Sequence, residues 1–503
     1  MVETIRTVGV IGAGVMGAGI AQVVAAAGYE TFLFDAQPGK ALEACDGIAA
    51  RFERLVEKGK MSDHDRGRAC DLLKPTDNLE SFSAVDLVVE AIVEILEVKQ
   101  QVLAAVEAVV GSDAIIVSNT SSLPLGAIAQ RLARKNRFAG LHFFNPVPLM
   151  KVAEVIPLLG GDHKTGERLT AFVRSIGHTP VVSADSPGFI INHAGRAYST
   201  EALRLLEEGV ADPASIDRIM RAAGFRMGPF ELFDLTGLDV SEPAMRAIYE
   251  GFYQEPRLRP SAVATERKLA GKLGRKTGEG FYRYLDGQRE DLTPNNVSQN
   301  HLDTDITVHV DLAFPKRTIA LDLLAEKAGL STTDDISSAD MILVDSGHSD
   351  LTNTICDRGL PKHKTFAMDP ALIDRSLICL MASPASDLTL QQVLVAHLRA
   401  NGDEVVCIQD SPSYVAQRMF SAIVNTAAGI VERGIASPQD LDTAVELGLG
   451  YPQGPLKWGD MLGPKHIVAA LEGLRVVTGD PRYRPVLWLQ RRAKLGMSLS
   501  NAA

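Results

Sequence analysis

A glycine-rich turn near the N-terminus limits the possible fold of this chain more than any other sequence feature. Residues 7–11 (TVGVI) are apolar and β-rich, and the run GAGVMG (12–17) follows them directly. The next residues, AGIAQVVAAAG, have a helical pattern that ends at Gly28, and YETFLFD then reads as a second strand ending at Asp35. A strand, a glycine turn, a helix and a second strand within about 30 residues form one βαβ unit of a parallel sheet.

The three glycines and Asp35 together indicate a site for a dinucleotide. Gly12 permits the tight turn, Gly14 lets the backbone approach a pyrophosphate, and Gly17 lets the helix pack closely on the strand. The N-terminus of the helix offers N–H groups and a positive dipole end to the phosphates. Asp35 follows Gly17 by 18 residues; it can accept both ribose hydroxyls and would repel a 2′-phosphate. The pattern therefore predicts NAD rather than NADP as the cofactor.

Residues 1–184 are expected to form an α/β domain with a Rossmann-type, doubly wound parallel sheet. Further segments that read as buried strands are 84–91, 114–120, 138–144 and 179–184. They alternate with helical segments, of which 40–74 is the longest, as in doubly wound sheets. From DSP (185–187) onward the pattern becomes helical, which predicts an all-α domain over 185–284.

The C-terminal half repeats part of the N-terminal half. The run DSP at 185–187 recurs at 410–412, an offset of 225, and Glu207 recurs at that offset as Glu432. The helical domain is therefore duplicated, with a second copy over 406–503.

The two segments between the helical copies have different patterns. Residues 285–314 are polar and are predicted to be a linker. Residues 315–405 contain β-like runs such as MILVD but no glycine turn. We expect this segment to be a degenerate, partial Rossmann-like domain without a phosphate site.

Composition excludes several classes of protein and site. The chain has 503 residues and a net charge of −11, from 51 basic and 62 acidic residues, which argues against a generally basic nucleic-acid-binding protein. The five cysteines are scattered, with no CxxC pair or Cys/His cluster, so no disulfide framework and no metal site are expected. No run of 18 apolar residues and no signal-peptide pattern occurs, so we expect no membrane span and a cytoplasmic protein.

A histidine and a serine-rich loop follow two of the predicted strands. His142 lies at the end of FAGLHFF (138–144), SNTSS (118–122) ends the strand before it, and Glu154 lies 12 residues after His142. The carboxyl ends of parallel strands meet at the edge where open α/β sheets bind ligands. A histidine oriented by a carboxylate is a strong general base, which an alcohol-oxidising dehydrogenase needs for the hydroxyl proton. Taken alone, His142 reads equally well as a hydrogen-bonded histidine of the core.

A basic face is expected on the helix that follows the second strand. Arg51, Arg54 and Lys58 are spaced to share one helical face, and Lys60 follows nearby. These cations could hold an anionic group such as the phosphates of coenzyme A. Glutamates are interleaved with them, so a solvated helix surface is the alternative interpretation.

Five segments together resemble the L-3-hydroxyacyl-CoA dehydrogenase family, over roughly residues 5–285. They are VGVIGAGVMGAGIA, VVEAIVEILEVK, SNTSS, GLHFFNPVPLMKVAEV and SPGFIIN. The double-length branch of the family, which acts in phenylacetate catabolism, is similar also in its degenerate second copy and in GYPQGPLKWGDMLG. The resemblance implies an oxidoreductase that uses NAD to convert an L-3-hydroxyacyl-CoA to a 3-oxoacyl-CoA in aromatic or fatty acid degradation (beta-oxidation). The expected substrate is 3-hydroxyadipyl-CoA or 3-hydroxybutyryl-CoA.

The resemblance also implies a role for each matched residue. His142 corresponds to the catalytic histidine, Glu154 to its carboxylate partner, and Ser121 and Asn192 to residues that bind the substrate oxygens. The implied cofactor contacts are Gly12, Gly14, Val15, Met16, Gly17, Asp35, Glu94, Lys99 and Asn119. The implied coenzyme A contacts are Arg54, Lys58 and Lys60. His193 departs from the pattern, because the family usually has an arginine there.

Two other functions stay open at this point. A dehydrogenase of the same superfamily that acts on a free sugar acid would share the fold, and a non-catalytic NAD-binding protein would share the glycine turn. The second half is not expected to catalyse, because Phe366 and Ile378 align with His142 and Glu154. The family pairs its helical domains across a dimer interface. The chain is therefore expected to be a homodimer or a monomer whose two helical domains pair internally.

Overall fold

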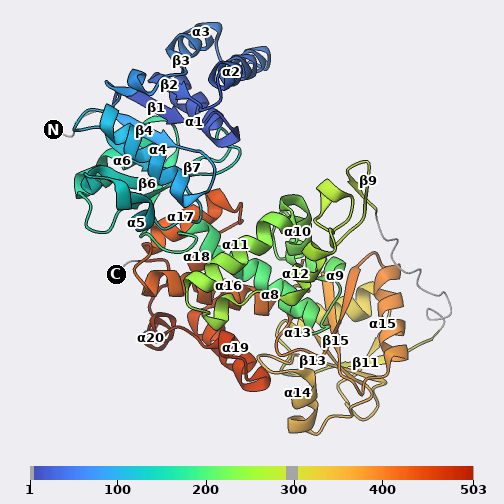
Figure 1. The fold of residues 1–503 in the computed structure, drawn as a ribbon. Coiled ribbons are helices and arrows are strands. Elements are labelled where there is room, and N and C mark those ends of the chain that lie inside the picture. Colours follow the sequence, from blue (N-terminus) through green and yellow to red (C-terminus); the bar gives the residue numbers. More distant parts are fainter. Residues whose placement is uncertain (1–4, 291–303, 376, 502–503) are drawn as a thin grey trace. The chain divides into compact units, whose positions relative to one another are not determined.

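The computed structural model describes residues 5–290, 304–375 and 377–501 (Figure 1). The chain divides into two compact units, and neither is a single stretch of sequence. The first unit joins Met1–Ala194 to Ile430–Gly454 and Ser500–Ala503, and the second joins Gly195–Gly429 to Pro455–Leu499. Part of the segment predicted as a second helical domain (406–503) therefore belongs to the first unit, which the boundaries expected from the sequence do not foresee.

The first unit contains an eight-stranded sheet in the order β3-β2-β1-β4-β5-β6-β7-β8. The strands are β1 (Thr7–Ile11), β2 (Glu30–Phe34), β3 (Leu73–Thr76), β4 (Leu87–Glu90), β5 (Ile115–Ser118), β6 (Phe138–Phe143), β7 (Val152–Pro157) and β8 (Thr179–Val182). All neighbours pair in parallel except β6 and β7, which are antiparallel. This order confirms the predicted Rossmann-type, doubly wound sheet.

Two strands of this sheet are absent from the sequence interpretation. β3 begins at the end of segment 40–74, which reads as helical, and it contains Pro75. It is an edge strand, where a missing N–H group removes no necessary ladder bond. β7 follows β6 after a turn that contains Asn145 and Pro146, with no helix between the two strands. The regular alternation of strands and helices, on which the sequence interpretation depends, stops at that turn.

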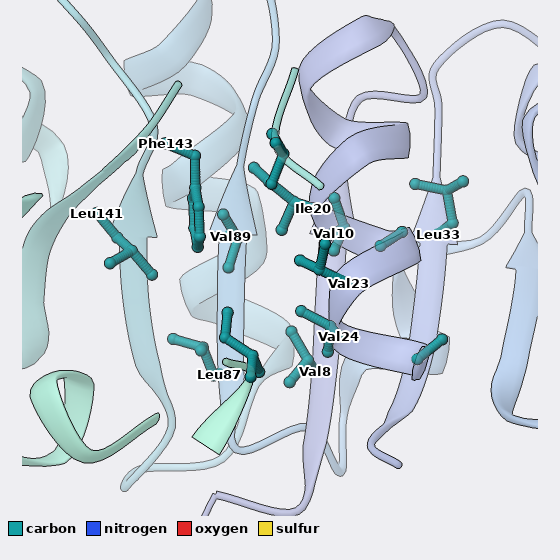
Figure 2. Packing of buried hydrophobic residues seen from close by; sticks show 14 of the residues in the cluster. Val8, Val10, Ile20, Val23, Val24, Leu33, Leu87, Val89, Leu141 and Phe143 are labelled. Carbon is teal, nitrogen blue, oxygen red and sulfur yellow. The ribbon is translucent and has the colours of Figure 1, made fainter. Parts of the chain in front are cut away.

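The helices of the first unit cover the sheet. They are α1 (Val15–Ala26), α2 (Lys40–Glu57), α3 (Asp63–Leu72), α4 (Leu96–Val109), α5 (Leu125–Ile128), α6 (His163–Ser175), α7 (Ile191–Ala194) and, from the second half of the chain, α17 (Pro438–Gly448). Figure 2 shows how α1 packs on the sheet, with Ile20, Val23 and Val24 against Val8 and Val10 of β1. These five side chains are 0–7% exposed, so the glycine turn stands on a well-packed base.

The same close packing explains two of the three glycines in the turn. A Cβ atom added to Gly17 would lie 1.7 Å from the carbonyl oxygen of Gly12, and one added to Gly12 would lie 2.5 Å from that of Ala91. Gly12 also has φ of 98°, a conformation that side chains disfavour. No other residue fits at positions 12 and 17 without moving the backbone.

The second unit contains a six-stranded sheet in the order β12-β11-β13-β14-β15-β16. Its strands are β11 (Thr307–Val310), β12 (Ser331–Thr332), β13 (Met341–Val344), β14 (Thr365–Met368), β15 (Leu377–Ala382) and β16 (Glu404–Gln409). The pair β14–β15 is antiparallel and β15–β16 is parallel, as β6–β7 and β7–β8 are in the first sheet. This sheet is the expected degenerate, partial Rossmann-like element. It begins inside the predicted linker 285–314, because β11 lies there; residues 291–303 of that linker are outside the described residues.

The rest of the second unit is mainly helical. The first helical repeat consists of α8 (Arg196–Glu207), α9 (Pro213–Ala222), α10 (Pro229–Thr236), α11 (Leu238–Gly251), η4 (Pro256–Leu258) and α12 (Ala262–Leu269). The second repeat contributes α16 (Val415–Glu432), α18 (Pro455–Leu462), α19 (Pro464–Thr478), η8 (Pro481–Tyr483) and α20 (Leu487–Leu495). A two-stranded ribbon, β9 (Tyr284–Leu285) and β10 (Gln288–Arg289), follows the first repeat. Throughout the described ranges, no helix has the length and apolar character that a membrane crossing requires.

Candidate active site

His142 and Glu154 form a buried pair across β6 and β7. The antiparallel register places them directly opposite each other, so both side chains extend from the same face of the sheet. His142 Nδ1 lies 2.6 Å from Glu154 Oε2, and the two residues are 5% and 0% exposed. A carboxylate can only accept, so Nδ1 is the donor of this hydrogen bond, and in a neutral imidazole Nε2 is then the nitrogen with the free lone pair.

A turn before α7 holds the other oxygen of Glu154. The N–H groups of Ile190 and Ile191 both donate to Glu154 Oε1 at 2.9 Å. Gly188 and Phe189, just before them, have φ of 75° and 48°, and this left-handed turn aims successive N–H groups at one anion. Backbone donors have no sequence signature, so sequence reasoning missed them.

Aromatic rings flank the imidazole of His142. Its centroid lies 4.4 Å from that of Phe144 and 5.8 Å from that of Phe189. These contacts restrict rotation of the imidazole and shield the pair from water. Asn192, the predicted substrate contact, follows Ile191 on α7 and is half-buried, so the turn that holds Glu154 also carries Asn192.

Glu94 organises the serine-rich loop that follows β5. Its Oε1 atom accepts hydrogen bonds from Thr120 Oγ1 at 2.6 Å and from the N–H groups of Ser121 and Ser122, each at 3.1 Å. Burial acts to raise the pKa of Glu94, but the hydrogen bond from Thr120 and the charge of Lys99 hold it below its usual value. Glu94 therefore fixes the backbone of Ser121 through a hydrogen bond, while the side chain of Ser121 is exposed.

Lys99 lies beneath this loop in a buried ion-pair network. Its Nζ atom is 2.6 Å from Glu90 Oε1 and 3.2 Å from Glu94 Oε2, and the residue is 1% exposed. Glu90 Oε2 in turn accepts from Ser118 Oγ at 2.5 Å. The resemblance implies a place for Lys99 near the nicotinamide end of the cofactor, and in the structure its ammonium pairs with the carboxylates of Glu90 and Glu94. Glu90 has no place in the sequence interpretation.

The glycine turn has the features that a pyrophosphate site requires. Gly14 is the N-cap of α1, no side chain of the described residues caps that helix end, and a Cβ atom at Gly14 would meet nothing within 4 Å. Val15 is 73% exposed and begins the helix beside Met16. The open N-terminal N–H groups and the free space beside Gly14 fit the phosphates of a dinucleotide.

Asp35 and Asn119 lie at two strand ends on either side of this turn. Asp35 Oδ2 accepts the N–H of Ala13 at 2.8 Å, which fixes the carboxylate beside the turn and leaves lone pairs for ribose hydroxyls. Asn119 Oδ1 accepts the N–H of Phe143 at 2.8 Å. The strand that carries His142 is thereby tied to the serine-rich loop.

A cavity of about 900 Å³ opens beside the glycine turn, between α1, α2 and the turn that joins β6 to β7. Its basic lining residues are Lys40, Arg51, Arg54, Lys60 and Lys151. Arg51 Nε donates to Gln22 Oε1 at 2.7 Å, and burial together with the neighbouring Arg54 lowers the pKa of Arg51. Its size and five cations suit a large polyanionic ligand.

Lys58 does not line this cavity, in contrast to the prediction from helical spacing. α2 ends at Glu57, so Lys58 is the cap residue and the helical face ends before it. Gly59 then reverses the chain with φ of 64°, and this brings Lys60 to the cavity. The i, i+3, i+7 argument extends the helix one residue too far.

The second sheet has no counterpart of the His142–Glu154 pair. Phe366 stands on β14 opposite Ala382 of β15. Ala382, not the expected Ile378, therefore occupies the position of Glu154, because the register sets Phe366 opposite a residue 16 positions later, whereas His142 faces one 12 positions later. Neither Phe366 nor Ala382 can exchange a proton. Across the described residues, no group of three or more His, Cys, Asp or Glu side chains could hold a metal ion.

Family comparisons match both halves of the chain. The model described as 3-hydroxyacyl-CoA dehydrogenase, NAD binding domain, matches residues 7–186. The model described as 3-hydroxyacyl-CoA dehydrogenase, C-terminal domain, matches residues 188–284 and again 414–500. The second match confirms the duplicated helical domain.

Individual relatives include proteins of the same length and of half that length. The chain is 35% identical over 499 residues to 3-hydroxyadipyl-CoA dehydrogenase of Escherichia coli, which covers 98% of this chain and 99% of that protein. Over 287 residues it is 40% identical to the mitochondrial hydroxyacyl-coenzyme A dehydrogenase of Sus scrofa, covering 56% of this chain and 91% of that protein. The crystal structure of 3-hydroxybutyryl-CoA dehydrogenase from Escherichia coli K12 matches with a TM-score of 0.85 at 34% identity, over 98% of this chain and 99% of that chain.

Proposed function

The chain belongs to the 3-hydroxyacyl-CoA dehydrogenase family, and on that premise we propose that His142 is the general base in the oxidation of an L-3-hydroxyacyl-CoA. The observation that carries this proposal is the contact of 2.6 Å between His142 Nδ1 and Glu154 Oε2. Since Nδ1 is occupied, Nε2 takes the proton of the 3-hydroxyl group. The product is the 3-oxoacyl-CoA.

Glu154 prepares His142 for this step. It orients the ring and stabilises the imidazolium that forms when Nε2 takes the proton, while the N–H groups of Ile190 and Ile191 keep the carboxylate in place. General base catalysis of this kind contributes roughly 10²–10⁴-fold to the rate. Ser121 and Asn192 hold the hydroxyl oxygen in line with Nε2.

The cofactor of this reaction is NAD, and the chemistry that it supplies when bound is acceptance of the hydride from C3 of the substrate. Gly12, Gly14 and Gly17 form the turn for its pyrophosphate, with the N–H groups of Val15 and Met16 at the helix end. Asp35 binds the ribose hydroxyls. Glu94 and Asn119 position the loop at the nicotinamide end, and Lys99 supports Glu94 from below.

The basic cavity beside the glycine turn is proposed to hold the coenzyme A part of the substrate. Arg54 and Lys60, which the resemblance implies as coenzyme A contacts, line it together with Arg51, Lys40 and Lys151. The excess of cations over the single lining carboxylate, Glu43, supports a polyanionic occupant such as the coenzyme A phosphates. A free sugar acid would leave most of this cavity unused, which favours the thioester over the sugar-acid alternative.

We propose 3-hydroxyadipyl-CoA as the acyl substrate, because the Escherichia coli relative of that name aligns with 98% of this chain. The matching crystal structure named for 3-hydroxybutyryl-CoA supports that shorter substrate as the second candidate. A series of kcat/KM values over both thioesters decides between them. A higher value for the C4 substrate would reject the adipyl proposal.

The chain is further proposed to act in the cytoplasm, as a monomer with internally paired helical repeats or as a homodimer. The five cysteines carry free thiols, and reduced thiols persist in a reducing compartment.

The test of the catalytic assignment compares two buried histidines of the first unit. His142→Gln is expected to retain NAD binding and to lose nearly all turnover of 3-hydroxybutyryl-CoA, followed as NADH absorbance. The control is His178→Gln, because the hydrogen bonds of His178 within the described residues go to the backbone oxygens of Val147 and Ile176 and a glutamine amide can replace such a bond. Activity of His142→Gln within a few-fold of the unmodified protein would overturn the assignment and would favour a non-catalytic NAD-binding protein.

A further inference from the structure

The two helical repeats meet within the second unit in a reciprocal manner. Arg257 Nη2 donates to the carbonyl oxygen of Arg484 at 3.0 Å, and Arg482 Nη2 donates to that of Arg259 at 3.2 Å. Residues 257 and 482 are equivalents at the repeat offset of 225, and so are 259 and 484. When residue i contacts j and the equivalent of j contacts the equivalent of i, the interface has twofold character.

A small enclosed cavity lies where the two repeats meet, and equivalent residues of the two repeats line it. It has room for about one water molecule, at about 10 Å³. Four pairs of equivalent residues line it, namely Ala197 and Ala422, Thr200 and Asn425, Glu201 and Thr426, and Arg257 and Arg482. Both repeats therefore contribute the same face, formed by α8 in the first repeat and α16 in the second.

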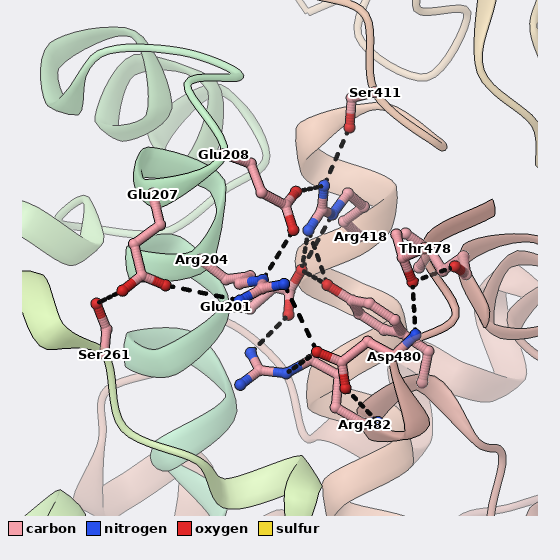
Figure 3. Close-up of polar contacts among 12 residues, drawn as sticks. Glu201, Arg204, Glu207, Glu208, Ser261, Ser411, Arg418, Thr478, Asp480 and Arg482 are labelled. Atoms are coloured by element: carbon pink, nitrogen blue, oxygen red, sulfur yellow. Dashed lines mark hydrogen bonds and ion pairs between the residues drawn. The ribbon is translucent and has the colours of Figure 1, made fainter.

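One polar group at this interface breaks the symmetry. Arg418 of α16 is 0% exposed, and its guanidinium donates to Glu201 Oε1 at 2.8 and 3.0 Å and to Glu208 Oε2 at 2.7 Å (Figure 3). It also donates to Ser411 Oγ at 3.1 Å and to Tyr483 Oη at 2.8 Å. We call these five residues the Arg418 cluster. Burial acts to raise the pKa of Glu208, but the Arg418 guanidinium holds it below its usual value, so the pair is ionised.

The equivalent positions of the other repeat cannot build this cluster a second time. His193 stands at the position equivalent to Arg418, Thr426 at that of Glu201, Arg433 at that of Glu208 and Leu258 at that of Tyr483. Both carboxylates and the phenol are thus replaced by groups that cannot accept from a buried guanidinium in the same way. The carboxylates belong to the first repeat and the arginine to the second.

We propose that the Arg418 cluster makes this interface specific for unlike repeats, so that the first repeat accepts the second repeat and rejects a copy of itself. Two second repeats placed face to face would bury Arg418 against Thr426 and Arg433, without a carboxylate. Two first repeats would bury two copies of Glu201, which is 2% exposed, with His193 in place of Arg418. An unpaired buried charge is strongly unfavourable, so the partner that fits is a helix with arginine at the position of Arg418. This inference does not depend on the proposed reaction.

The first experiment uses charge reversal in the full chain. Arg418→Glu alone brings three carboxylates together, and Glu201→Arg alone brings two guanidinium groups together. Each single variant is expected to lower Tm by about 5 °C or more. The double variant, Glu201→Arg with Arg418→Glu in one chain, is expected to recover most of that loss.

The second experiment asks whether the cluster selects a partner. The two single variants, carrying different tags, are co-expressed as full chains, so that each first repeat can pair correctly only with the second repeat of the other chain. Native mass spectrometry is expected to show a larger fraction of dimers that carry both tags than the unmodified chain gives when it is co-expressed with the same two tags. A cluster that stabilises but does not select would give no such increase.

The matched control moves the carboxylate to the equivalent position, as Glu201→Thr with Thr426→Glu. This variant is expected to remain as unstable as Glu201→Thr alone, because Arg418 contacts position 201 and not position 426. The proposal is overturned if this control regains the Tm of the unmodified chain. It is also overturned if both charge-reversed single variants keep that Tm, or if neither the double variant nor the mixed chains recover it.

Discussion

His142 Nδ1 and Glu154 Oε2 lie 2.6 Å apart because the antiparallel register of β6 and β7 sets the two residues directly opposite each other. The pair therefore depends on one register in the one antiparallel step of the first sheet. A slip of a single residue would turn one of the two side chains to the other face. The chemistry of the site is thus tied to the strand pairing and not only to the presence of both residues.

Glu154→Gln tests the contribution of the carboxylate within this pair. The amide keeps the shape of the side chain, but it cannot stabilise the imidazolium that forms on His142. We expect kcat to fall roughly 10²–10⁴-fold, with KM for NAD within about threefold of the unmodified protein. Steady-state kinetics with both substrates varied measures this, and an unchanged kcat would contradict the role given to Glu154.

A pair of alanine substitutions separates packing from cofactor binding in the glycine turn. Gly17→Ala places a Cβ atom 1.7 Å from Gly12 O and is expected to cost about 1–3 kcal/mol of unfolding free energy or more. Gly14→Ala has free space around its Cβ atom and a φ of −70°, so it should keep its Tm and instead raise the KM for NAD. Thermal unfolding and NAD titration of both variants check this. Equal loss of Tm in both would show that the two glycines have the same structural role.

Charge removal along α2 distinguishes the cavity from the rest of the helix. Arg54→Ala and Lys60→Ala are each expected to raise KM for 3-hydroxybutyryl-CoA severalfold, because both residues line the cavity. The effect should shrink as salt is added, since exposed cations are screened. Lys58→Ala serves as comparison, because Lys58 is the helix cap outside the cavity, and its KM should not change. An equal rise in KM for Lys58→Ala would show that Lys58 also binds the substrate, as helical spacing predicts.

The stability contributed by Glu94 is expected to depend on pH. Its pKa is below the usual 4.5 in the folded protein, because the hydrogen bond from Thr120 and the charge of Lys99 outweigh burial. The ionised form is thus favoured by folding, and the contribution is complete above about pH 4.5 and is lost as the pH falls through the lowered folded value. The Tm of the unmodified chain should exceed that of Glu94→Gln at pH 7, and the difference should shrink as the pH falls below about 4.5. A Tm difference that grows on acidification would contradict the prediction that folding favours the ionised form of Glu94.

Much of the first sheet is predictable from local pattern. The glycine turn, the second strand ending at Asp35, and the strands that carry SNTSS and His142 all lie where periodicity and flanking residues place them. β3 and β7 escape that reasoning, because a short edge strand containing Pro75 and a strand that returns without a helix have no distinctive local pattern. The register of β7 nevertheless decides whether Glu154 meets His142.

The residues of the candidate site also fall into those that the sequence predicts and those that it does not. Its side chains at strand ends can be named from the sequence, whereas the N–H groups of Ile190 and Ile191, the buried Glu90 and the true end of α2 before Lys58 cannot. His193, which stands where the family usually has an arginine, is a further case in which the sequence shows the residue but not its structural consequence. The arginine that the family usually carries there occurs at the equivalent position in the second repeat, as Arg418, and only the structure shows that its partners, Glu201 and Glu208, come from the first repeat.

The sequence by itself determines the βαβ unit with its NAD preference, the identity of the His142 and Glu154 candidates, and the duplication of the helical domain. Each of these depends on residues close together in the chain or on matching residues at one fixed offset. The tertiary structure alone decides the pairing of His142 with Glu154, the cavity lined by Arg54 and Lys60, and the one-sided pairing of Arg418 with the first repeat. These features form between distant segments, and which surfaces meet depends on strand register and on the burial of apolar and charged groups, which local pattern does not specify.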